Sequence, residues 1–195
     1  IPYGPKAPPY TSPLDLYPST GAPTSLISLR TGAPVGLGLL LKEHLCNQPK
    51  VLFCPSSDQP LDANAQLANV GTRQAQCSFY YRHAGNTTLF DNPNVGLARA
   101  EHIRLDELGM NRNGVPIRAL VIDTQFLCSS GLATFGVTPS THHRQRTADI
   151  LFSDGHTVSR SNRNGRFVVD LSDYSEVRDA FNKILKVLEQ ADTEP

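Results

Sequence analysis

The 195-residue chain has no tryptophan, a single methionine and no excess charge of either sign. Its 18 lysines and arginines balance 18 aspartates and glutamates, so no long-range field draws the protein to nucleic acid or to an anionic membrane. A surface near neutrality permits self-association instead, because like copies do not repel one another. We therefore expect no nucleic-acid partner, and a homo-oligomer is compatible with the composition.

Long apolar runs are also missing. The longest uncharged apolar stretch, residues 35–41, is far shorter than the roughly 18 residues that a membrane-spanning helix needs. No charged segment followed by an apolar core marks a signal peptide, so the chain has the character of a mature protein. At this length we expect one domain with an extension, no membrane span, and a core that needs no metal or cofactor.

Proline is present but unevenly distributed. Residues 1–34 hold eight of the 15 prolines and only three charged residues. This spacing forbids a helix and favours an extended backbone, while the leucines, isoleucines and tyrosines of the segment need a surface to lie on. The pattern predicts an extended Pro-rich arm, residues 1–34, followed by a single globular domain, residues 35–195.

The globular part predicts a mixture of helices and strands. A helix is expected at residues 34–46, where leucines share one face, and a helical turn at residues 63–67. Strand-forming residues predict strands at residues 51–54, 77–82, 117–126 and 166–171.

The clearest element is the last one. Asp173 followed by Glu176 has the form of a capping box, and apolar residues then repeat at intervals of three and four. They are Val177, Ala180, Phe181, Ile184, Leu185, Leu188 and Ala191. The fold class is therefore α+β, an antiparallel sheet with packed helices that include this amphipathic C-terminal helix, preceded by the extended Pro-rich arm.

The run from Ile150 to Val158 predicts a hairpin. Strand-forming residues precede Asp154-Gly155 and a β-branched pair follows, which favours a two-residue type I′ turn with Gly155 at positive φ. The hairpin belongs to a set of stretches that also includes Lys50-Val51-Leu52-Phe53-Cys54-Pro55-Ser56, Ala119-Leu120-Val121-Ile122-Asp123 and His142-His143.

Together these stretches resemble the globular part of bacterial type IV pilin-like and pseudopilin-like proteins, over roughly residues 35–160. The C-terminal signature of that family is a His, about nine residues and Asp-Gly, whereas ten residues separate His143 from Asp154 here. The apolar N-terminal helix that anchors and polymerises such pilins is not found in this sequence. The chain is therefore expected to be a processed remnant or a subunit that polymerises in another way.

The resemblance implies a structural subunit of an extracellular filament or cell-surface assembly, without catalysis and without a cofactor. Residues 1–27 of the arm are expected to join subunits into a helical polymer, since donor and acceptor surfaces differ. The export that the resemblance implies predicts disulfides, and the alternative is buried free thiols. The candidates are Cys46, Cys54, Cys77 and Cys128, with the pairing left open.

A runner-up hypothesis is a secreted hydrolase or carbohydrate-binding module that uses His143, Asp154 and His156. Together with His142, these are the possible metal ligands or acid–base groups of the hairpin region, and Asp123 ends a buried strand. No serine or cysteine stands in a nucleophile motif such as Gly-x-Ser-x-Gly, and the turn alone explains Asp154. We therefore expect no catalytic residue and no metal ligand.

Two surface features remain. Asn86-Thr87-Thr88 is an N-glycosylation sequon, and the serines and threonines between residues 11 and 25 have the composition of an O-glycosylated stalk. Both patterns also occur in ordinary polar loops and linkers. Five arginines between residues 144 and 166 form a basic patch, but without interleaved aromatic residues it does not indicate nucleic-acid binding.

Overall fold

The computed structural model describes most of the globular part of the chain. The described residues are 24–28, 31–45, 48–59, 62–70, 73–82, 105–106, 108–135, 137–173 and 175–194. Residues 1–23 of the predicted arm, Cys46 and Asn86 lie outside them. The described part contains no helix that is long and apolar enough to span a bilayer, in line with the expectation of no membrane span.

A four-stranded antiparallel sheet forms the centre of the domain, so the expected mixed α+β class is confirmed. Its spatial order is β1-β2-β4-β5. The strands are β1 (Phe79–Tyr81), β2 (Ala119–Asp123), β4 (Thr147–Phe152) and β5 (Thr157–Ser161). β2 and β4 lie in the middle; four of the five residues of β2 are buried, whereas burial alternates along β4, and Ile122 and Ile150 are both 0% exposed.

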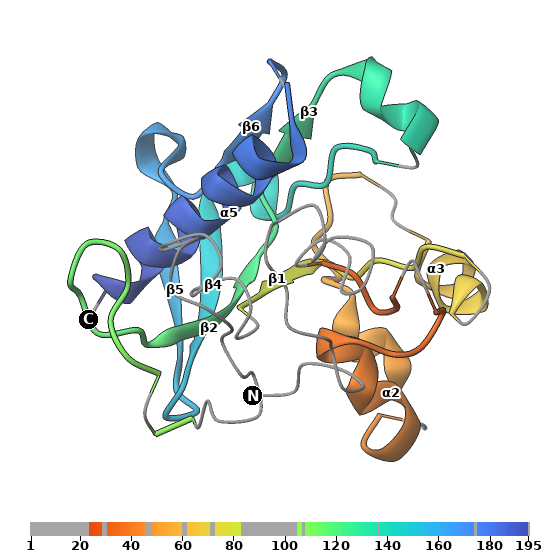
Figure 1. Cartoon of the computed structure of the whole chain (residues 1–195), viewed down its shortest axis with the longest axis horizontal. Coiled ribbons are helices and arrows are strands. Elements are labelled where there is room, and N and C mark those ends of the chain that lie inside the picture. The colour runs from red at the N-terminus through yellow and green to blue at the C-terminus, as the bar shows by residue number, and fades with distance from the viewer. Residues whose placement is uncertain are drawn as a thin grey trace.

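Helix α5 (Val177–Asp192) crosses one face of this sheet (Figure 1). Five of the seven predicted apolar positions are buried, Phe181, Ile184, Leu185, Leu188 and Ala191, and Val187 is buried as well. Its predicted start is wrong, because the N-cap is Glu176 and Asp173 instead accepts a hydrogen bond from the Lys183 ammonium at 2.7 Å. The amphipathic helix is thus confirmed, and the capping box is not formed.

The expected strand at residues 117–126 is two strands. β2 ends at Asp123 and β3 (Phe126–Cys128) pairs in parallel with β6 (Val169–Leu171) in a separate two-stranded sheet. Gln125 lies between them, 0% exposed, and its side-chain amide donates to the carbonyls of His142 and Thr147. A buried glutamine that bonds to neighbouring backbone redirects the chain from one sheet to the other.

The N-terminal half packs as a second, smaller core beside β1 (Figure 1). It contains the 3₁₀ turn η1 (Gly36–Gly38), helix α2 (Leu39–Glu43), the 3₁₀ turn η2 (Pro49–Leu52) and helix α3 (Ala63–Asn69). The helical turn predicted at residues 63–67 is confirmed. The strand predicted at residues 51–54 is wrong, because that segment winds into η2 and a turn in which Val51 is 57% exposed.

Residues 24–28, at the end of the predicted arm, belong to this smaller core. Leu26 is fully buried, and its N–H donates to the carbonyl of Ala75 at 2.9 Å. Gly38 lies so close that an added Cβ would stand 1.8 Å from the carbonyl oxygen of Leu26, so no other residue fits there. Within the described part, the end of the predicted arm therefore packs against its own domain from residue 24 onward.

The hairpin between β4 and β5 is confirmed, but its turn is not the expected two-residue type I′. The connection comprises residues 153–156, with the Gly155 N–H bonded to the Phe152 carbonyl at 3.0 Å. Gly155 has a φ of +90°, whereas Asp154 is not among the residues with positive φ. A type I′ turn requires both, so the turn is the wider kind that needs glycine at one position only.

Asp192 joins α5 to the sheet. Its carboxylate accepts two hydrogen bonds from the Arg82 guanidinium, at 2.7 and 3.0 Å, and a third from the Asn111 amide at 2.9 Å. The backbone N–H groups of Arg118 and Ala119 also donate to it, at 2.9 and 3.0 Å. Both charged side chains are almost fully buried, so helix and strand are tied by a fully desolvated ion pair.

We predict that Asp192→Ala lowers the free energy of unfolding by about 3–5 kcal/mol, because it leaves the Arg82 charge buried without its partner. Urea unfolding measures the change. Asp173→Ala is the control, since that carboxylate is 83% exposed and also binds a cation, Lys183. Equal unfolding midpoints for the two variants would contradict the prediction.

Candidate functional site

Three chemically reactive side chains from distant parts of the sequence converge beside the central sheet. The ligand atoms of Cys54, Asp123 and His143 all lie within 4.8 Å of one another. Nε2 of His143 is 3.6 Å from Sγ of Cys54 and 3.2 Å from Oδ2 of Asp123. Nε2 also lies 3.5 Å from Oδ2 of Asp149, which makes His143 the centre of the group.

The two carboxylates are placed by the central strands. β2 and β4 pair antiparallel with Ile122 opposite Ile150, so Asp123 and Asp149 stand one position further along and face each other. The Asp149 N–H donates to Oδ2 of Asp123 at 3.0 Å. Asp123 is 1% exposed, whereas the side chain of Asp149 is half-exposed and accepts a hydrogen bond from the Ser159 hydroxyl.

His143 stands on an unusual turn. His143, Arg144 and Gln145 have φ values of 53°, 53° and 56°, a left-handed conformation that non-glycine residues rarely adopt in succession. Each such residue costs roughly 1–2 kcal/mol. The loop at residues 54–59 holds the turn, because the His143 N–H donates to the Ser56 carbonyl at 3.0 Å and the Arg144 N–H to Oδ1 of Asp58 at 2.9 Å.

His142 has a different environment from its neighbour. It is 0% exposed, and its Nδ1 lies 2.8 Å from the Thr124 carbonyl oxygen, with which it hydrogen-bonds as a donor. The Gln125 amide donates to the His142 carbonyl at 3.0 Å. His142 therefore fixes the segment before the turn to the end of β2, and His143 alone of the pair reaches the cluster.

The local charges do not activate Cys54 as a nucleophile. Burial raises the pKa of the Cys54 thiol, and the negative charges of Asp123 and Asp149 raise it further. Burial likewise raises the pKa of Asp123, with the charge of Asp149 acting in the same direction. Reactive cysteines occupy electropositive surroundings instead, so this thiol is a poor nucleophile at neutral pH.

The geometry also differs from a nucleophilic triad. In a Cys–His–Asp relay one ring nitrogen faces the nucleophile and the other is oriented by the carboxylate. Here the same nitrogen, Nε2 of His143, faces both Cys54 and Asp123. The arrangement therefore suits the joint coordination of one positively charged species better than proton relay.

The predicted cluster of His143 with Asp154 and His156 is not formed. His143 precedes the first residue of β4, whereas Asp154 and His156 follow the last. The six residues of β4 separate the two groups by roughly 17–20 Å of strand. His156 pairs with Asp154 instead, through Nδ1 and Oδ1 at 2.5 Å, at the exposed end of the hairpin.

The cysteines correct another expectation. Cys54, Cys77 and Cys128 are free thiols, so the three described cysteines form no disulfide with one another. Reasoning from the sequence treated Cys54 as a disulfide candidate and missed its position beside His143. It also missed Asp149, and both were hidden for the same reason, since only the three-dimensional pairing of loop, turn and strands brings them together.

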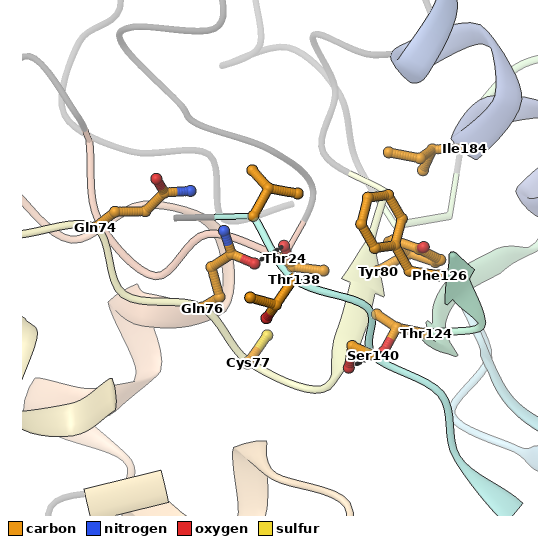
Figure 2. A pocket seen from close by; sticks show the side chains of 11 residues that line it. Thr24, Gln74, Gln76, Cys77, Tyr80, Thr124, Phe126, Thr138, Ser140 and Ile184 are labelled. Carbon is orange, nitrogen blue, oxygen red and sulfur yellow. Dashed lines mark hydrogen bonds between the residues drawn. The ribbon is translucent and has the colours of Figure 1, made fainter. Parts of the chain in front are cut away.

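A separate pocket lies between residues 24–28, β1 and β3 (Figure 2). Figure 2 shows Cys77, Gln76 and Thr138 on one side of it and Tyr80 and Phe126 on the other. Its volume is about 60 Å³, whereas sites for small organic ligands typically enclose about 300–1,000 Å³. The pocket gives no support to a sugar-binding site in this part of the described chain.

Comparisons with protein-family models, curated proteins and solved structures found no match for this chain. The resemblance to pilin-like proteins therefore rests on the residues that carry it. Asn86 lies outside the described residues, so its glycosylation stays a prediction.

We predict opposite effects of glycine at two exposed arginines, Arg144 and Arg146, that stand two positions apart. Arg144→Gly relieves a left-handed residue and should leave stability unchanged or raise it by up to about 1 kcal/mol, whereas Arg144→Val should lower it by about 1–3 kcal/mol. Arg146 has a φ of −89°, so Arg146→Gly, the control, should lower stability by about 0.5–1 kcal/mol. Thermal unfolding measures all three, and equal destabilisation by both glycines would argue against strain at the turn.

We also predict selective alkylation of the native, unreduced protein. Burial raises the pKa of Cys77 to about 12, so its thiol should stay unmodified until the chain unfolds. Cys54 and Cys128 are only partly buried and should react slowly with iodoacetamide, faster as the pH rises. Peptide mass spectrometry reads each site, and a disulfide-linked peptide containing any of the three would contradict the free-thiol assignment.

Proposed function

We propose that the protein is a non-catalytic structural subunit of an extracellular filament or cell-surface assembly, as its resemblance to pilin-like proteins implies. One observation carries the proposal: the hairpin of the resemblance is anchored to the main core by contacts of Asp154, Phe152 and His156.

The hairpin part of the signature illustrates this use. Oδ1 of Asp154 accepts a hydrogen bond from the His156 N–H at 3.2 Å, which closes the turn. The His156 ring stacks on Phe152 with 4.5 Å between ring centroids and 9° between planes. Phe152 is 1% exposed, so the turn is anchored to the main core. These contacts supply rigidity, which a structural subunit needs.

The sheet offers a surface for assembly. Among the described residues β5 pairs only with β4, so its other edge has no strand partner in that part of the chain, although the Ser161 carbonyl accepts a hydrogen bond from the Arg166 side chain. An extended segment from a neighbouring subunit can add to such an edge by β-augmentation. Residues 1–23 have the composition for this role, with few charges and a backbone that proline stiffens, which reduces the entropy lost on docking.

A donor segment and an acceptor edge are different surfaces, so the contact is heterologous. A heterologous contact that does not close into a ring generates a helical polymer. The near-neutral chain places no electrostatic barrier against such stacking. The enzyme or sugar-binding alternative loses its basis, because His143 lies far from Asp154 and His156 along β4.

We predict that deletion of residues 1–23 gives a folded, soluble monomer that forms no filaments. The deletion ends before residue 24 because residues 24–28 are buried in the domain and would be lost only at the expense of its smaller core. Electron microscopy shows whether filaments form, and analytical ultracentrifugation measures whether the variant is a monomer.

The matched control replaces residues 1–23 by a glycine–serine segment of equal length, which keeps the chain length and removes the apolar side chains. It should behave like the deletion. Ordered polymers formed by either variant, or a full-length chain that stays monomeric under all conditions of concentration and salt, would refute the proposed assembly.

A further inference from the structure

The structural role proposed above leaves the convergence of Cys54, Asp123 and His143 unexplained, since a rigid domain does not need these groups in contact. We propose that they bind a divalent metal ion of the zinc type, and that the half-exposed side chain of Asp149, 3.5 Å from Nε2 of His143, turns in as the fourth ligand. The inference does not depend on whether the protein assembles into filaments.

The distances are those of a tetrahedral site. Zinc lies about 2.3 Å from a cysteine sulfur and about 2.0–2.2 Å from histidine nitrogen or carboxylate oxygen, so neighbouring ligand atoms stand about 3.4–3.6 Å apart. The observed separations from Nε2 of His143 are 3.6 Å to Cys54, 3.2 Å to Asp123 and 3.5 Å to Asp149. These separations lie within about 0.2 Å of the expected length for three of the six edges of that tetrahedron.

The charges around the cluster favour a cation. Asp123 and Asp149 face each other on adjacent strands, an arrangement of like charges that destabilises a sheet. Asp123 is 1% exposed, so water does little to screen it. Asp58 lies close enough to act on Cys54 as well. A bound divalent ion converts this repulsion into coordination.

The donor set selects the class of metal. A sulfur and an imidazole nitrogen do not suit calcium or magnesium, which prefer oxygen ligands alone. Sulfur, nitrogen and carboxylate oxygen together are typical of zinc and its neighbours in the first transition row. With four protein ligands the site is closed, which is typical of a structural rather than a catalytic ion.

The site is also held and reachable. His143 borders an open hollow that Ser56, Asp58, Arg144, Arg146 and Thr147 also line, and its side chain is 25% exposed to solvent. The Ser56 N–H hydrogen-bonds to Cys54, and the Ser159 hydroxyl donates to the other oxygen of Asp149. Outer contacts of this kind orient metal ligands.

The test uses the full chain, purified without a histidine tag and freed of metal by a chelator. Zinc is titrated in competition with a chromophoric chelator, and a single zinc ion per chain should bind. Each substitution of a ligand should weaken binding by about 10-fold or more, on the scale of changes in metal-site partners. The ligand variants are Cys54→Ser, Asp123→Asn, His143→Asn and Asp149→Asn, each conservative in size.

Matched variants change the same residue types outside the cluster. Cys128→Ser, Asp154→Asn and His156→Asn should bind zinc like the unaltered chain. Misfolding is separated from ligand loss by cobalt, whose thiolate charge-transfer absorption reports sulfur in the coordination sphere. That absorption should appear in the unaltered chain and in His156→Asn, and should vanish in Cys54→Ser while circular dichroism stays unchanged.

Three outcomes would overturn the proposal. The first is an unaltered chain that binds no zinc in competition with the chelator, and the second is binding by Cys54→Ser and His143→Asn as tight as that of the control variants. Cobalt bound without the thiolate absorption would place the ion elsewhere. A full-length chain that binds zinc but stays monomeric in the assembly test would count against the proposed function alone, so the two can fail separately.

Discussion

The buried carboxylate of Asp192 is the interaction on which the rest of the fold depends. It stands at the last residue of α5 and accepts hydrogen bonds from Arg82, at the end of β1, and from the backbone at the beginning of β2. One side chain thus fixes the helix to the two strands beneath it. Because β2 is held at its first residue, its last residue, Asp123, is placed beside β4 and the turn at His143.

This position is electrostatically unfavourable for an acid, since the C-terminus of a helix carries partial negative charge. The arginine and the amide and backbone donors around Asp192 offset that cost and the cost of burial. An apolar contact in the same place would stabilise the helix in several orientations. The hydrogen bonds of the ion pair form in one orientation of the helix only. The pair therefore fixes the position of α5 on the sheet as well as stabilising the fold.

The elements with strong local patterns are those that the sequence predicts well. The helix predicted from the three-and-four apolar repeat is present as α5, and the two strands predicted for the hairpin are present as β4 and β5. Residues 51–54 are equally apolar, yet the 3₁₀ turn that begins at Pro49 includes Val51 and Leu52, and Leu52 alone of the four is buried. A short apolar run does not distinguish a strand from a turn that buries a single side chain.

The cluster at His143 has no local signal at all. Its members come from positions 54, 123, 143 and 149, and three successive left-handed residues without glycine are a conformation that local sequence preferences do not predict. Such a turn exists because tertiary bonds hold it, in the form of the Ser56 carbonyl and the Asp58 carboxylate. Those two residues belong to the loop that carries Cys54. Loop and turn are therefore stable only as a pair, and strain in the backbone of one is balanced by contacts with the other.

An ion held between Cys54 and His143 joins the same two segments, so its coordination energy would act directly on the strained turn. Local strain at this position is consistent with a site whose geometry is set by what it binds rather than by the preference of its own chain.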